Sequence, residues 1–150
     1  MTYTPHAWQY GLAYLLWAVS MILSVFCGLV LRDVYQAIIY AAGWHRYTAS
    51  AADKFLILAA AIGLLVAFVV TEYLYRTGVE KRRLWPRFSL VTAIELSILG
   101  VLHLIRLGLE ATYGILDPVL ALVVVLELGG ALFFWWLYAR TSRIVTLSTH

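Results

Sequence analysis

Four long apolar stretches constrain the fold of this chain more than any other feature. The first, from Ala7 to Leu31, contains no Asp, Glu, Lys or Arg. A helix of about 20 such residues crosses the hydrocarbon layer of a bilayer, which is ~30 Å thick. The other stretches run over about residues 55–75, 88–109 and 118–139. Because the bilayer core contains no water to bond with backbone groups, these groups must bond to one another, and apolar segments of this length therefore indicate helices. We therefore expect an all-α, integral membrane four-helix bundle with four transmembrane helices.

The composition indicates that lipid is the solvent of this chain. Hydrophobic residues make up 63% of it and charged residues 13%, whereas about a quarter of the residues in a soluble domain are charged. The mean hydropathy of +0.87 agrees. A soluble fold with this composition would expose large apolar patches to water and aggregate. Since four spans and short turns use the whole length, we expect a single transmembrane domain over residues 1–150.

The segment from Val34 to Tyr47 leaves two structures open. Its apolar residues recur at helical spacing until Gly43, which is followed by a polar and aromatic cluster. This pattern predicts a short helix that either lies at the membrane interface or prolongs the first span, and that ends at Gly43. Thr48 or Ser50 is then expected to cap the second transmembrane helix.

Small residues recur at four-residue spacing in the first two spans. Small side chains favour helix association in lipid because they let two backbones approach closely. We therefore predict that the first two helices pack tightly along these residues, and the alternative is a chance recurrence of common residue types. The predicted helix-packing residues are Ser20, Ser24 and Gly28 in the first span and Ala59, Gly63 and Ala67 in the second.

Basic residues cluster between the second and third spans. With that loop in the cytoplasm, seven of the 11 Lys and Arg residues lie on the cytoplasmic side and four on the other. The positive-inside rule then predicts that both termini are cytoplasmic, in a membrane that the sequence does not identify. A basic loop beside spans also favours anionic lipid headgroups over nucleic acid as a partner. The residues expected to contact these headgroups are Arg76, Lys81, Arg82, Arg83 and Arg87.

Three ionisable side chains inside the spans form the candidate site: Glu95, His103 and Glu127. Charged groups in lipid are costly, and each therefore marks a functional hypothesis. At ~1.5 Å of rise per residue, Glu127 in the fourth helix falls between Glu95 and His103 of the third in depth. We predict a buried polar cluster that accepts a proton or binds a cation. The alternative is that neutral carboxyls form hydrogen bonds which fix the helix register.

The sequence gives little support to a cofactor or a metal. His103 follows Gly100 by about one turn and is a candidate ligand of a tetrapyrrole, but a bis-His haem needs a second intramembrane histidine. CxxC, HExxH and glycine-rich phosphate-loop motifs are absent from the sequence. The open alternatives are therefore no cofactor, a tetrapyrrole or a quinone. The residues match the motifs of no family that we recognise.

Three functions follow from these features. The first is a small, non-catalytic subunit that packs in a larger, for example energy-transducing, membrane complex or in a homo-oligomer. Very short extramembrane segments favour it. The second is a proton- or cation-coupled transporter that acts as an oligomer. The third is a small membrane enzyme acting on a lipophilic substrate, or a pigment- or haem-binding subunit through His103. We favour the first, so catalysis is not expected.

Overall fold

The computed structural model describes residues 7–114 and 117–147, and four α-helices account for nearly all of them. These are α1 (Ala7–Ala41), α2 (Arg46–Glu80), α3 (Leu84–Thr112) and α4 (Pro118–Leu147). Each helix is long and apolar enough to cross a membrane. The prediction of an all-α membrane protein with four apolar helices packed together is confirmed.

Helix α1 is longer than the first predicted span. It continues without interruption to Ala41, so residues 34–41 prolong the first helix instead of forming a separate interfacial one. Gly43 has a φ of 64°, a left-handed conformation that glycine adopts without steric cost. The amide of Trp44 donates to the carbonyl of Ile39, which satisfies an acceptor at the helix end.

Helix α2 begins earlier than the predicted caps. Its first residue is Arg46, and His45 stands at the N-cap position with an extended backbone and no side-chain capping bond. Thr48 and Ser50 therefore lie inside the first turns, and the prediction that one of them caps α2 is wrong. The reason is the sharp turn at Gly43, after which the chain returns to helical geometry within three residues.

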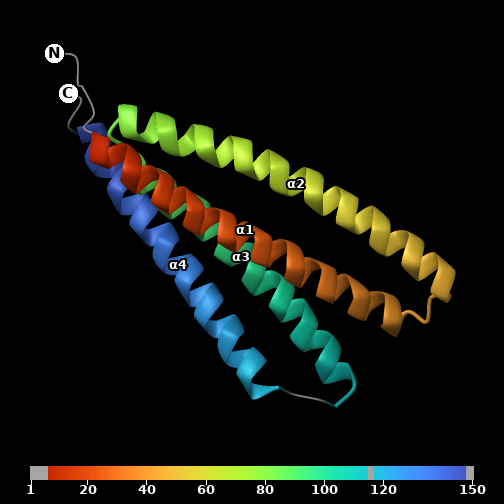
Figure 1. Cartoon of the computed structure of the whole chain (residues 1–150). Coiled ribbons are helices and arrows are strands. Elements are labelled where there is room, and N and C mark those ends of the chain that lie inside the picture. Colours follow the sequence, from red (N-terminus) through yellow and green to blue (C-terminus); the bar gives the residue numbers. More distant parts are fainter. Residues whose placement is uncertain (1–6, 115–116, 148–150) are drawn as a thin grey trace.

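The four helices form two hairpins, α1–α2 and α3–α4, which converge at one end and diverge toward the other (Figure 1). The convergent end holds the α2–α3 connection, the start of α1 and the end of α4. Helix α3 is central because it packs extensively against α4 and also against α1, and touches α2 over a shorter length. The divergent arrangement leaves α2 poorly covered: its buried residues are Thr71, Tyr75, Gly78 and Val79, all near its C-terminal end.

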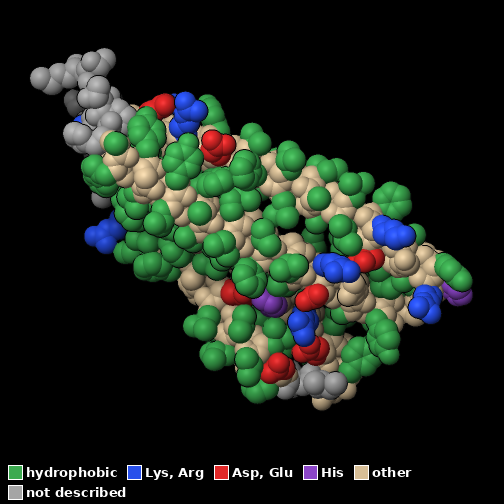
Figure 2. All heavy atoms as spheres, in the orientation of Figure 1, with side chains coloured by type: hydrophobic (Ala, Val, Ile, Leu, Met, Phe, Trp, Pro, Cys, Tyr) green, Lys and Arg blue, Asp and Glu red, His purple; other side chains and the backbone are tan. Residues whose placement is uncertain are grey.

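The surface suits a lipid environment. Hydrophobic side chains cover most of the face seen in Figure 2, and ionisable side chains gather in one group at the convergent end and in another that extends from the middle of the face toward the divergent end. Leu65 and Val125 are each 67% exposed, and Leu132 is 71% exposed. Exposed apolar area on this scale is stable against acyl chains and not against water.

Candidate functional site

Glu95 of α3 is a buried carboxyl with one unsatisfied oxygen. The residue is only 6% exposed. Ser24 of α1 donates a hydrogen bond of 2.7 Å to its Oε1, and the Cys27 thiol lies 3.6 Å from its backbone oxygen. Oε2 is buried without a hydrogen-bond partner among the described residues. A buried polar atom left in this state costs about 1–3 kcal/mol, so Glu95 both ties α1 to α3 and retains an unused hydrogen-bonding capacity.

His103 and Glu127 form a second, separate polar site. His103 Nδ1 of α3 lies 2.8 Å from Glu127 Oε2 of α4, and the two side chains are 14% and 15% exposed. The helices approach closely beside this pair, because a Cβ added at Gly100 would lie 2.6 Å from Leu128 Cδ2. The pair therefore joins the two helices beside a closely packed part of the α3–α4 hairpin.

The structure divides the predicted three-residue cluster into these two sites. Glu95 and His103 are eight residues apart on α3, which is about 12 Å along a helix axis. Glu95 is bonded to α1, whereas His103 is bonded to α4. No group of three His, Cys, Asp or Glu side chains suited to a metal ion occurs among the described residues. Glu127 lies at a depth between Glu95 and His103, as predicted from the rise per residue. However, Glu95 points toward α1 and His103 toward α4, so the two residues belong to different sites.

The predicted small-residue seams border an open groove instead of a tight contact. This interhelix groove is lined by residues of α1, α2 and α3 and has a volume of about 410 Å³. A Cβ added at Gly63 would meet nothing within 4 Å, and one added at Gly28 would touch only Leu64, at 3.8 Å. The prediction of close backbone packing along these seams is therefore wrong at Gly63. The lining residues are Ser24, Cys27, Gly28, Leu31, Leu56, Ala59, Ala60, Gly63, Leu64, Ala67, Glu95, Ile98 and Leu102.

The divergence of the hairpins explains why the groove stays open. Ser20 Oγ lies 2.7 Å from Tyr75 Oη, a bond that holds α1 against α2 near the convergent end. Ser24, one turn further along α1, bonds to α3 and not to α2. Beyond that point α2 moves away from the bundle (Figure 1). Of the predicted packing residues, Ser20 alone thus makes a hydrogen bond between α1 and α2.

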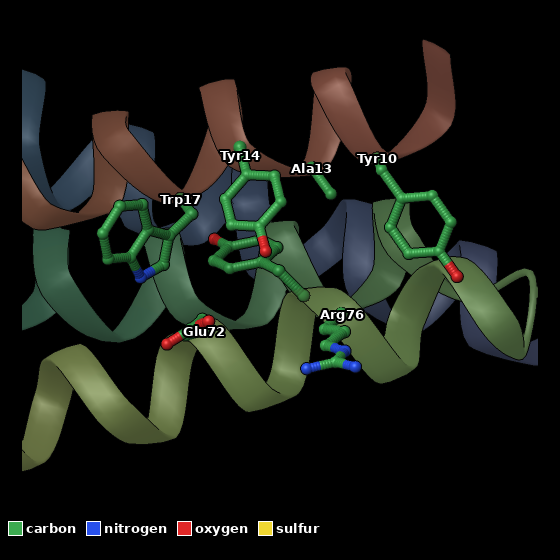
Figure 3. Close-up of a pocket in the computed structure, with 7 residues that line it drawn as sticks. Tyr10, Ala13, Tyr14, Trp17, Glu72 and Arg76 are labelled. Carbon is green, nitrogen blue, oxygen red and sulfur yellow. The ribbon is translucent and has the colours of Figure 1, made fainter. Parts of the chain in front are cut away.

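Aromatic side chains fill the convergent end of the α1–α2 hairpin. Tyr10, Tyr14 and Trp17 project from α1 toward Glu72 and Arg76 of α2 (Figure 3). The cavity among them measures about 10 Å³, which is room for about one water molecule. The indole nitrogen of Trp17 is buried without a partner among the described residues. The sequence pattern did not indicate this small pocket, because it depends on how α1 packs against α2.

Charged side chains at the divergent end form exposed ion pairs. Arg32 Nε lies 3.1 Å from Asp53 Oδ1, and Arg106 Nε lies 2.9 Å from Glu110 Oε1. Both arginine side chains are more than two-fifths exposed, and pairs of this kind contribute ~1 kcal/mol or less. A wide cleft of about 560 Å³ separates α1 from α3 here, lined in part by Asp33, Tyr40, Arg106 and Glu110. These ion pairs form a charged surface beyond the apolar middle of the bundle.

The basic residues predicted to contact lipid headgroups lie around the α2–α3 connection. One of them is engaged within the protein: Arg87 Nη1 donates hydrogen bonds to the carbonyl of Leu74 and to the hydroxyl of Thr77. Arg82 has a φ of 53° at the turn between the helices. Arg87 therefore helps to fix the α2–α3 connection, and contact of the cluster with anionic lipid stays a prediction.

No protein-family model, curated protein or solved structure matches this chain.

Proposed function

We propose that the chain is a non-catalytic subunit of a larger membrane complex. The observation that carries this proposal is the pairing of its intramembrane polar side chains across helices. Ser20 bonds to Tyr75, Ser24 to Glu95, and His103 to Glu127. Each pair joins two different helices, so these side chains serve the assembly and register of the bundle.

The short connections between the helices also support this role. The described helices are joined by segments 42–45, 81–83 and 113–117, which offer little surface to a soluble partner or substrate. Contact with other molecules is therefore made through the helices themselves. Small membrane chains of this kind act through helix packing, which in lipid depends on shape and on interhelical hydrogen bonds.

We place the partner contact on α2. Its residues from Arg46 to Val70 include no buried position, whereas α3 is buried at positions from Pro86 to Leu102. A helix that leans away from its own bundle is the one whose packing another subunit completes. The outward face of α2 includes Leu58, Ile62 and Leu65, which are 58%, 59% and 67% exposed.

Site-specific crosslinking in native membranes tests this placement. A benzophenone amino acid at Leu65 is expected to give one discrete protein adduct. Val125 of α4 is the matched control because it is equally exposed, at 67%, and it is expected to give lipid adducts only. Lipid adducts alone at both positions, or the same protein adducts at both, would contradict an interface on α2.

A proton- or cation-coupled transporter is a second candidate, and the His103–Glu127 pair favours it. A partly buried imidazole and a carboxyl group 2.8 Å apart can hold or pass a proton. Purified protein in vesicles that contain a pH-sensitive dye tests this function. Proton movement that is lost in Glu127→Gln would support transport. Failure of the wild-type protein to move protons or cations under any gradient would exclude it, and that failure is the result we expect.

We also propose that the α2–α3 connection and both termini face the cytoplasm, as the distribution of basic residues predicts. Single cysteines at Thr77 and Thr112, in a chain whose Cys27 is replaced by alanine, report the orientation. An impermeant thiol reagent added outside the cell is expected to label position 112 and not position 77. The opposite pattern means that the orientation is inverted.

A further inference from the structure

We propose that the interhelix groove binds a lipophilic small molecule that carries a single hydrogen-bonding group, and that this group pairs with Glu95. The proposal concerns a binding site and does not depend on whether the chain has a protein partner. It rests on three properties of the groove: its size, its lining and the unsatisfied carboxyl oxygen of Glu95.

The size and lining of the groove suit a small apolar molecule. Its volume of about 410 Å³ lies within the range of about 300–1,000 Å³ that is common for small-molecule sites. Nearly all lining residues are aliphatic or small, and the polar ones are Ser24, Cys27 and Glu95. Ala59 and Gly63 are exposed on the α2 wall, so a molecule dissolved in the bilayer can enter from the side. A mostly apolar cavity with few polar groups is the usual form of such sites.

Glu95 has a hydrogen-bonding capacity that neither the described residues nor phospholipid headgroups satisfy. It is 6% exposed, it lines the groove, and its Oε2 has no hydrogen-bond partner among the described residues. It lies about 17 Å from the start of α3 and about 25 Å from the end, counted at 1.5 Å per residue. This position is deep in an apolar layer ~30 Å thick, whereas phospholipid headgroups stay at its edges.

These properties define the chemical class of the ligand. It has an apolar body that fills the space beside Gly63 and Ala67, and one hydroxyl or similar group that reaches Glu95. A hydroxyl both donates and accepts, so it pairs with the carboxyl in either protonation state. A phospholipid acyl chain fills the groove but leaves Oε2 unpaired. A transmembrane helix from another protein is the other occupant that the test must distinguish.

Photolabelling with dodecanol that carries a diazirine in its chain tests the proposal. The protein is labelled in native membranes and, after purification, in lipid nanodiscs, and the modified peptides are mapped by mass spectrometry. Adducts are expected on residues 24–31, 56–67 and 95–102, which line the groove, in both preparations. Excess dodecanol should remove them, and excess dodecane, which lacks only the hydroxyl, should not.

Two pairs of variants connect the labelling to the groove and to Glu95. Gly63→Leu fills the groove and should reduce its labelling several-fold, whereas Gly129→Leu, at an open position on α4, should leave it unchanged. Glu95→Leu should weaken competition by dodecanol about fivefold, which is the scale of one hydrogen bond. Glu95→Gln keeps a hydrogen-bonding side chain and should retain most of that competition, and it serves as the folded control if Glu95→Leu does not assemble.

Three outcomes would overturn the proposal. Equal competition by dodecanol and dodecane would mean that the groove holds acyl chains without recognition by Glu95. Adducts outside residues 24–31, 56–67 and 95–102, or adducts unaffected by Gly63→Leu, would mean that the groove is not the binding site. Groove labelling in nanodiscs that is absent in native membranes would assign the groove to the helix of another protein.

Discussion

The two hairpins of this protein use small residues in opposite ways. In the α3–α4 hairpin, a Cβ added at Gly100 would lie 2.6 Å from Leu128, and one added at Gly130 would lie 3.1 Å from Leu96. In the α1–α2 hairpin, a Cβ added at Gly63 would meet nothing within 4 Å. The same residue type thus permits close packing in one hairpin and keeps a groove open in the other. A small residue in a membrane helix indicates available space and does not reveal what fills it.

This difference separates a closed half of the molecule from an open half. The α3–α4 interface is the most extensive in the bundle and contains the His103–Glu127 pair. The α1–α2 hairpin is joined near its convergent end by Ser20 and Tyr75 and near its turn by Arg32 and Asp53, and it is open between these two contacts. We expect the closed half to determine the stability of the isolated chain and the open half to carry its interactions with other molecules.

The largest effect is expected from overpacking the closed hairpin. Gly100→Leu places a side chain where Leu128 already lies, so either Leu128 must repack or the helices must separate. We expect a loss of stability of ~1–3 kcal/mol, measured as a decrease of several degrees in the melting temperature in mild detergent. An unchanged melting temperature would show that α3 and α4 are not in close contact at this point.

The next effect concerns the bond between α3 and α4. Glu127→Leu leaves the partly buried His103 ring without its partner, which costs about 1 kcal/mol. Glu127→Gln is the matched variant because its side-chain oxygen can accept a hydrogen bond from His103, and its loss should be smaller. Equal melting temperatures for the two variants would mean that the pair contributes little to the closed hairpin.

A smaller effect is expected at the convergent end of the open hairpin. Ser20 and Tyr75 join α1 to α2 through their hydroxyls, and such bonds in membrane bundles contribute about 0.6 kcal/mol on average. A double-mutant cycle with Ser20→Ala and Tyr75→Phe measures this coupling free energy. A coupling free energy near zero would mean that the surrounding aromatic packing, and not this hydrogen bond, holds α1 against α2.

The smallest effect is expected from Gly63→Leu. Because no atom lies within 4 Å of the added Cβ, the melting temperature of the isolated chain should change little. It should resemble that of Gly129→Leu, the equally open position on α4. A decrease as large as that of Gly100→Leu would show that the open hairpin closes in solution.

The sequence was sufficient to predict the helices because hydrophobic length alone determines them. The absence of charges from Ala7 to Leu31 predicts a transmembrane span directly. The apolar spacing from Val34 to Gly43 predicted that the chain stays helical after this span, and α1 continues to Ala41. The arrangement of the helices could not be predicted in the same way. The spacing of Ala59, Gly63 and Ala67 is the same whether the opposite surface is a helix or a groove.

The candidate site also separates what the sequence predicts from what depends on helix packing. Helix periodicity identified Glu95, His103 and Glu127 as intramembrane polar residues. It could not predict that Ser24 bonds to Glu95 while His103 bonds to Glu127, because those choices depend on how α1 and α4 pack against α3. The unsatisfied Glu95 Oε2 likewise follows from packing, and no residue pattern in one chain indicates it.

Native mass spectrometry of the protein, extracted from its own membrane in mild detergent, tests the proposed role as a subunit most directly. Because the polar side chains within the bilayer are largely used to join helices and α2 remains poorly covered, we expect the 16.9 kDa chain in a stoichiometric complex with another membrane protein. Dissociation should release both components intact. Detection of the chain alone, or only in multiples of its own mass, would contradict a role as a subunit of a larger complex.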